Sequence, residues 1–117
     1  MKLLFVENHE EFAAVVIGAF LSQHEVTRVA SVSAARAALT RGSFDAVLVD
    51  YDLDDGKGDL LVAWLVAARS PAPPTVAISS HEHGNNALMR AGANAACPKP
   101  QFHRIAEVLA TLTKSAG

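Results

Sequence analysis

The sequence predicts an α/β fold in which helices cover both faces of a doubly wound, five-stranded parallel sheet. Short apolar segments alternate along the chain with longer amphipathic segments, the pattern of parallel strands joined by crossover helices. Two short segments, Leu3–Val6 and Ala46–Val49, are continuously apolar, as expected of strands buried on both faces. Five strand–helix units favour the strand order 2-1-3-4-5. Ligands then bind beyond the carboxyl ends of the strands, at the switch point between the first and third.

The expected strands are short and mostly rich in Val, Ile or Leu, although the last is dominated by Ala. They are Lys2–Val6, Glu25–Ala30, Ala46–Val49, Thr75–Ile78 and Asn94–Cys97.

The segments after these strands have helical composition and apolar spacing. They are Glu10–Ser22, Ser33–Arg41, Gly58–Arg69, Asn85–Ala91 and Phe102–Thr113. Either Ser31 or Ser33 can cap the second helix at its start, because a serine oxygen accepts from the free backbone N–H groups there. Gly42 and Gly92 lie just past the second and fourth helices, where glycine commonly ends a helix.

A chain of 117 residues predicts one compact domain, residues 1–117. Half of the residues are hydrophobic and 19% are charged, which provides enough apolar material for a core and excludes a disordered chain.

Charge and cysteine content narrow the function classes. Ten basic and twelve acidic residues give a net charge of −2 without a run of Lys or Arg, so we expect no direct nucleic-acid binding. The longest apolar stretches, Ala13–Leu21 and Leu60–Ala68, have nine residues each, fewer than the roughly 20 that a membrane helix needs. The single cysteine, Cys97, cannot form an internal disulfide. These features predict a cytoplasmic protein.

Polar side chains follow four of the expected strands. Glu7 and Asn8 follow the first strand, Asp50 the third, Ser79 the fourth and Lys99 the fifth. Carboxylate and amide oxygens suit Mg²⁺, while a lysine and a serine hydroxyl can bind phosphoryl oxygens. The group therefore predicts a phosphoryl-transfer site in which a carboxylate is the nucleophile.

These residues, in this order and spacing, resemble the receiver domains of response regulators in two-component signalling (CheY-like), from Leu3 to about Thr113. The matching motifs are Leu3-Leu4-Phe5-Val6-Glu7-Asn8, Val47-Leu48-Val49-Asp50 with Gly58 eight residues on, Ala77-Ile78-Ser79-Ser80, Ala91-Gly92-Ala93 and Lys99-Pro100.

The resemblance implies a role for each of these residues. Asp50 matches the phospho-accepting aspartate, and Glu7 and Asn8 match the acidic pair that binds Mg²⁺. The backbone carbonyl of Asp52 falls where the family supplies a further metal ligand, so the implied metal set is Glu7, Asn8, Asp50 and Asp52.

Two further residues complete the implied site. Ser79 matches the switch hydroxyl, with Ser80 as the fallback if the register slips, and Lys99 matches the lysine that pairs with the phosphoryl group. The family also implies a cis peptide bond between Lys99 and Pro100.

The chain departs from the family pattern in three places. The second acid of the metal pair is replaced by Asn8, which removes one negative charge and should weaken Mg²⁺ binding. The position of the aromatic switch residue falls on Ala96, so no ring can rotate there. The segment from Ser79 to Gly92 is about two residues shorter than usual, which predicts a short or reshaped fourth helix.

The resemblance implies a signalling domain, not an enzyme. A histidine kinase or phosphotransfer protein would phosphorylate Asp50 with Mg²⁺. A downstream protein, or a second copy of the chain, would then read the face made by helix 4, strand 5 and helix 5.

Two alternatives remain open on the sequence. Asn8 motivates a pseudo-receiver, which keeps the fold as a protein-binding module but is not phosphorylated. Val47–Asp52 also resembles the first motif of haloacid-dehalogenase-type phosphatases, although that motif normally lies on the first strand. The run His81-Glu82-His83 lacks the spacing of a zinc protease helix, so we interpret it as a solvated loop. The resemblance implies that His81, two residues beyond Ser79, can modulate dephosphorylation.

Overall fold

A five-stranded parallel sheet forms the centre of the molecule in the computed structural model, which describes residues 1–116. The strand order is β2-β1-β3-β6-β7. Because β6 and β7 are the fourth and fifth strands of this sheet, the predicted order 2-1-3-4-5 is confirmed. The strands are β1 (Lys2–Val6), β2 (Glu25–Val29), β3 (Ala46–Val49), β6 (Thr75–Ala77) and β7 (Ala95–Ala96).

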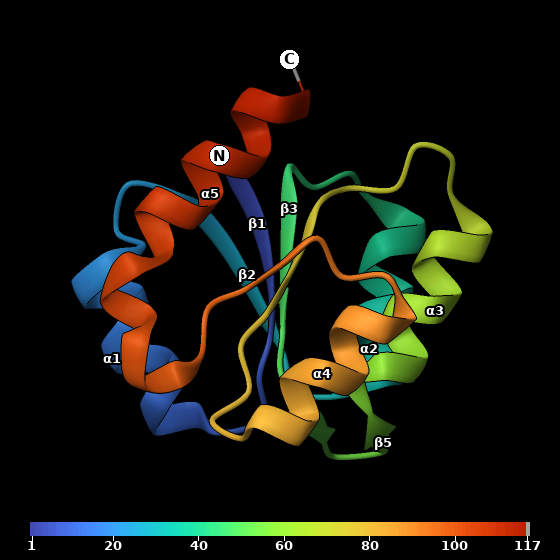
Figure 1. Ribbon diagram of the computed structural model, residues 1–117, viewed down its shortest axis with the longest axis horizontal. Helices are drawn as coiled ribbons and strands as arrows, with labels where there is room; N and C mark the ends of the chain where they lie inside the picture. The colour runs from blue at the N-terminus through green and yellow to red at the C-terminus, as the bar shows by residue number, and fades with distance from the viewer. Residues whose placement is uncertain (117) are drawn as a thin grey trace.

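Helices cover both faces of this sheet, as Figure 1 shows. They are α1 (Glu10–Phe20), α2 (Val32–Arg41), α3 (Gly58–Ala68), α4 (Glu82–Ala91) and α5 (Ile105–Ala116). Successive strand residues point to opposite faces, so the strands feed two cores. Leu3 and Phe5 of β1 pack with α1 and α5, whereas Leu4 and Val6 pack with α2, α3 and α4.

The fourth helix differs from the prediction. It begins at Glu82, three residues before the expected start, and has ten residues, as many as α2. The predicted start at Asn85 is therefore wrong. The sequence His81-Glu82-His83 is polar and suggested a loop, but an acidic residue is favourable in a first helical turn, where backbone N–H groups are unpaired.

Two short structural elements were not predicted. An antiparallel pair, β4 (Asp52–Leu53) and β5 (Gly56–Lys57), directly follows Asp50. Its turn carries Asp55, whose carboxylate accepts the backbone N–H groups of Val32 (2.6 Å) and Ser33 (3.1 Å) at the start of α2.

The beginning of the last helix was also misplaced, because a 3₁₀ helix, η1 (Lys99–Arg104), precedes α5. Of the two serines predicted as caps of α2, Ser31 takes this role, and its hydroxyl accepts from Ala34 N at 3.1 Å.

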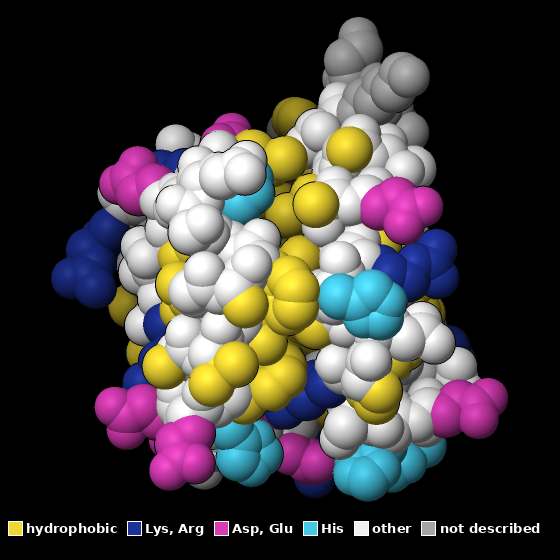
Figure 2. Space-filling view, turned by 90° about the vertical axis from the view of Figure 1, so that its left-hand side faces the viewer, with side chains coloured by type: hydrophobic (Ala, Val, Ile, Leu, Met, Phe, Trp, Pro, Cys, Tyr) yellow, Lys and Arg dark blue, Asp and Glu magenta, His cyan; other side chains and the backbone are white. Residues whose placement is uncertain are grey.

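The carboxyl ends of the strands lie at the lower edge in Figure 1, and the start of β1 and the end of α5 lie at the upper edge. Figure 2, a view of the face formed by α1 and α5, shows hydrophobic side chains in the groove between these helices. Charged and histidine side chains gather at the lower edge. Within residues 1–116, no helix has the length and apolar composition that crossing a bilayer requires.

Candidate functional site

Two carboxylates from adjacent strands meet at the carboxyl edge of the sheet. Val6 of β1 pairs with Val49 of β3, and Asp50 N donates to Val6 O at 3.0 Å. The residues that follow this pair, Glu7 and Asp50, therefore lie side by side. Lys99 Nζ joins them, at 2.9 Å from Glu7 Oε1 and 3.1 Å from Asp50 Oδ2. The structure thus brings together three of the predicted site residues.

Both carboxylates are removed from water, since Glu7 is 0% and Asp50 4% exposed. Burial raises the pKa of Asp50, the neighbouring Glu7 carboxylate raises it further, and Lys99 opposes the rise. Lys99 itself packs against the ring of Phe12, with Nζ 4.8 Å from the ring centroid, a favourable cation–π contact. One ammonium group therefore partly compensates two crowded carboxylates.

The position of Asp50 depends on a close backbone approach. Its Oδ1 accepts from Tyr51 N at 2.8 Å. The first residue of α3, Gly58, donates its N–H to Tyr51 O at 2.6 Å. A Cβ atom on Gly58 would lie 2.0 Å from Asp50 O, so a side chain at position 58 would collide with the backbone of Asp50.

The loop from β1 to α1 supplies Asn8 and His9. Asn8 Oδ1 is buried and has no hydrogen-bond partner within the described part of the chain. The N-cap of α1 is His9, whose side chain makes no capping hydrogen bond. His9 instead turns toward Glu7: its N–H donates to Glu7 Oε2 at 3.0 Å, and Nδ1 lies 3.2 Å from the same oxygen.

Ser79 is buried next to this group and held by its neighbours. Its Oγ accepts from His81 N at 3.1 Å, while Ser80 is exposed. Asn85 of α4 binds the Ser79 backbone twice: Oδ1 accepts from Ser79 N at 2.8 Å, and Nδ2 donates to Ser79 O at 2.9 Å. The buried Gly84 leaves room for this arrangement, because a Cβ there would lie 2.6 Å from Ser79 Oγ.

The Lys99–Pro100 peptide bond is trans, so the expected cis bond there is wrong; within the described residues the cis bond is Ser70–Pro71. Pro100 is the second residue of η1, and helical backbone requires trans peptide bonds. Lys99 nevertheless reaches both carboxylates.

The remaining predicted residue, Asp52, lies at the rim of the site. Its side chain is exposed and pairs with Lys57, and this hydrogen bond lowers the pKa of Asp52. Nearby, Tyr51 meets His83 edge to face at 5.8 Å, and His81 stacks on His83 at 5.5 Å.

Among the described residues, one group of side chains could hold a metal ion: Glu7, His9 and Asp50, with ligand atoms within 4.8 Å of one another. The run His81-Glu82-His83 does not form such a group. Sequence reasoning missed His9, although it directly follows the predicted pair. It also missed Asn85, whose role depends on the fold of α4 and has no sequence signal.

The comparisons agree with this geometry. The family model of the response regulator receiver domain matches residues 3–110, and the chain belongs to this family. Receiver domains are signalling domains and generally not enzymes. No curated protein matches the sequence significantly.

Solved receiver domains share the fold at low sequence identity. The receiver domain of the sensor histidine kinase PA1611 from Pseudomonas aeruginosa has a TM-score of 0.84 and 23% identity, with 94% of each chain covered. That of the Francisella response regulator 1452 has a TM-score of 0.86 and 15% identity, covering 99% of this chain and 98% of the other. The Thermotoga maritima response regulator TrrA, solved with Mg²⁺–BeF, has a TM-score of 0.85 and 16% identity, covering 96% of this chain and 99% of the other.

Proposed function

We propose that this receiver domain accepts a phosphoryl group on Asp50 from a histidine kinase or phosphotransfer protein, with a divalent cation, and that the new charge changes a protein-binding surface. The observation that supports it best is the buried pair of Glu7 and Asp50 bridged by Lys99. Burying two like charges lowers stability, which favours a functional reason for keeping them. The set contains a carboxylate nucleophile and an ammonium group that can stabilise phosphoryl charge, as phosphoryl transfer needs.

The residues present fit a cation. Glu7 and Asp50 offer buried carboxylates, Asn8 Oδ1 is a buried oxygen without a partner, and the Asp52 backbone carbonyl would be the fourth ligand. Hard oxygen ligands of this kind suit Mg²⁺. The Pseudomonas receiver domain holds a magnesium ion in its active site cleft. A bound Mg²⁺ would offset the carboxylate charge and the charge on the phosphoryl oxygens.

In the reaction, a carboxylate oxygen of Asp50 attacks the phosphorus of a phosphohistidine. The phosphorus–nitrogen bond breaks, its electron pair stays on the imidazole, and an acyl phosphate forms. Lys99 would pair with one phosphoryl oxygen. Ser79 Oγ accepts from His81 N, so its own O–H remains available to donate to another.

Asn85 offers a route from the site to α4. Because it binds both backbone groups of Ser79, a shift of Ser79 toward the phosphoryl group would also move the start of α4. This route needs no aromatic ring on β7, where Ala96 is small and exposed.

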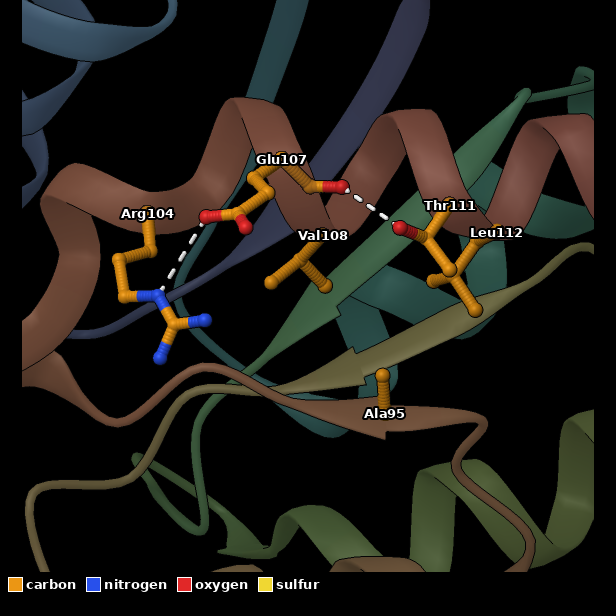
Figure 3. A pocket seen from close by; sticks show the side chains of 6 residues that line it. All are labelled: Ala95, Arg104, Glu107, Val108, Thr111 and Leu112. Atoms are coloured by element: carbon orange, nitrogen blue, oxygen red, sulfur yellow. Dashed lines mark hydrogen bonds and ion pairs between the residues drawn. The ribbon is translucent and has the colours of Figure 1, made fainter.

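The surface we propose for output lies on α4, β7 and α5. Part of it is a cavity of about 180 Å³, shown in Figure 3, between Ala95 of β7 and Val108 and Leu112 of α5. At its edge, Arg104 Nε lies 3.5 Å from Glu107 Oε2. An apolar floor with charged residues at the rim is typical of protein-binding surfaces.

The test is intact mass after incubation with a small-molecule phosphodonor, with and without Mg²⁺. The wild type should gain one phosphoryl group only with the metal, Asp50→Asn should gain none, and Asp54→Asn, at an exposed aspartate of the β4–β5 turn, should behave like the wild type. Equal phosphorylation of Asp50→Asn would contradict the assignment of Asp50.

Asn8 supports a second candidate, the pseudo-receiver. Lys99 already compensates the two carboxylates in part, and the amide of Asn8 contributes no charge to attract a cation. No phosphorylation with any divalent cation would favour this alternative and direct the search toward binding partners.

A further inference from the structure

The metal-binding group of this chain contains a nitrogen ligand. One ligand atom each from Glu7, His9 and Asp50 lies within 4.8 Å of the other two. Ligand atoms about 2.0–2.3 Å from a common ion lie no more than about 4.6 Å apart when they are opposite one another. The three side chains therefore need only small movements to bind one ion.

His9 is positioned for this role by its backbone. Its N–H donates to Glu7 Oε2 at 3.0 Å, which fixes the start of the side chain, and Nδ1 lies 3.2 Å from the same oxygen. The side chain is 67% exposed, so the ring can turn toward the two carboxylates without disturbing the core.

A second observation also indicates a cation here. Asn8 Oδ1 is buried and has no hydrogen-bond partner among the described residues. A buried polar atom without a partner calls for an explanation such as an ion or a water molecule. Because Asn8 lies between Glu7 and His9 in the chain, one cation near these residues could satisfy it.

The chemistry of this set differs from an all-oxygen site. An amide replaces a carboxylate at position 8, and an imidazole stands at position 9. Mg²⁺ strongly prefers oxygen, whereas imidazole suits the later divalent transition metals. We propose that His9 is a metal ligand of this site, so that a divalent transition metal binds there in preference to Mg²⁺. This inference rests on the proposed function, because it concerns the same site.

Mn²⁺ is a suitable probe because it is paramagnetic and a nitrogen ligand modulates its electron spin echo. We expect nitrogen modulation from Mn²⁺ bound to the wild type and its loss in His9→Ala. His103→Ala, at an exposed histidine of η1, should keep the modulation. The double variant His81→Ala/His83→Ala should also keep the modulation, and it tests whether the stacked histidine pair at the rim supplies the nitrogen ligand.

Affinity provides an independent readout. By calorimetry with Ni²⁺, a later transition metal that imidazole suits, His9→Ala should weaken binding about tenfold or more, since even the loss of groups that orient a ligand costs about 10–100-fold. Mg²⁺ binding should change less than about twofold. Equal weakening of binding for both metals would show that His9 only shapes the loop and would overturn the inference. Nitrogen modulation that is absent from the wild type, or that survives in His9→Ala, would also overturn it.

These measurements use no phosphodonor, so the two proposals can fail separately. Phosphorylation of Asp50 with Mg²⁺, together with no nitrogen modulation, would refute the role of His9 and leave the receiver function standing. Nitrogen modulation together with no phosphorylation of Asp50 in the presence of either metal would support the role of His9 and refute the receiver function.

Discussion

The substitution Gly58→Ala tests how closely α3 must approach Asp50. A Cβ at position 58 would lie 2.0 Å from Asp50 O, whereas real contacts of this type are essentially never under 3.0 Å. The start of α3 and the Asp50 backbone must therefore separate by about 1.0 Å, the difference between these two distances. Such a shift would also break the 2.6 Å hydrogen bond from Gly58 N to Tyr51 O.

The size of the effect follows from these two losses. Strain from an extra methyl group in a packed site costs about 1–3 kcal/mol, and the hydrogen bond contributes about 0.5–1.5 kcal/mol. The better helix propensity of Ala returns about 0.5–1 kcal/mol. We therefore expect the free energy of unfolding to fall by about 2–3 kcal/mol in urea titrations, and the Tm to fall by roughly 10 °C.

Gly18→Ala is the matched control. Gly18 lies within α1, and a Cβ there would meet nothing within 4 Å. The same change should therefore raise the free energy of unfolding by about 0.5–1 kcal/mol. If Gly58→Ala is neutral or stabilising like Gly18→Ala, the close approach to Asp50 is wrong.

Three further predictions concern the groups around Asp50. Asn85→Ala removes the side chain that binds the buried backbone N–H and C=O of Ser79, which should lower the free energy of unfolding by about 2–3 kcal/mol. The control is Asn86→Ala, at an exposed position, which should change the free energy of unfolding by less than about 0.5 kcal/mol. Lys99→Met leaves both buried carboxylates without their cationic partner and should lower the free energy of unfolding by about 2–4 kcal/mol at neutral pH. The loss should be smaller in acid. A loss of stability that does not depend on pH would indicate instead that Lys99 acts by packing against Phe12. Burial raises the pKa of Asp50, so the Asp50 carboxyl group keeps its proton to higher pH in the folded protein than in the unfolded chain. The stability of the wild type therefore falls as the pH rises from the ordinary Asp pKa through the raised value. Asp50→Asn should therefore be more stable than the wild type at neutral pH, and this advantage should disappear below the ordinary Asp pKa in denaturation measured across pH.

The two central strands, β1 and β3, were predictable because each is short, mainly apolar and largely buried. Lys2–Val6 and Ala46–Val49 have the predicted bounds, and parallel topology then places Glu7 beside Asp50. The start of α4 was not predicted, because Glu82, His83 and Asn85 are polar and Gly84 has a poor helix propensity, whereas in the structure Asn85 binds the Ser79 backbone from within the helix. Likewise, no sequence pattern shows that Lys99 reaches both carboxylates through a trans peptide bond.

The charge at the site explains why Asn8 matters more for the metal than for the fold. Glu7 and Asp50 contribute two negative charges and Lys99 one positive charge, which leaves a net charge of −1. An acid at position 8 would make it −2 and attract a cation more strongly, but it would also repel the incoming phosphoryl group. Asn8→Asp should therefore tighten Mg²⁺ binding by about tenfold, equivalent to about 1.4 kcal/mol. It should also lower stability in the absence of metal, because a third carboxylate joins the buried pair. Calorimetry and urea titration measure the two effects, and an unchanged Mg²⁺ affinity would mean that position 8 does not contact the ion.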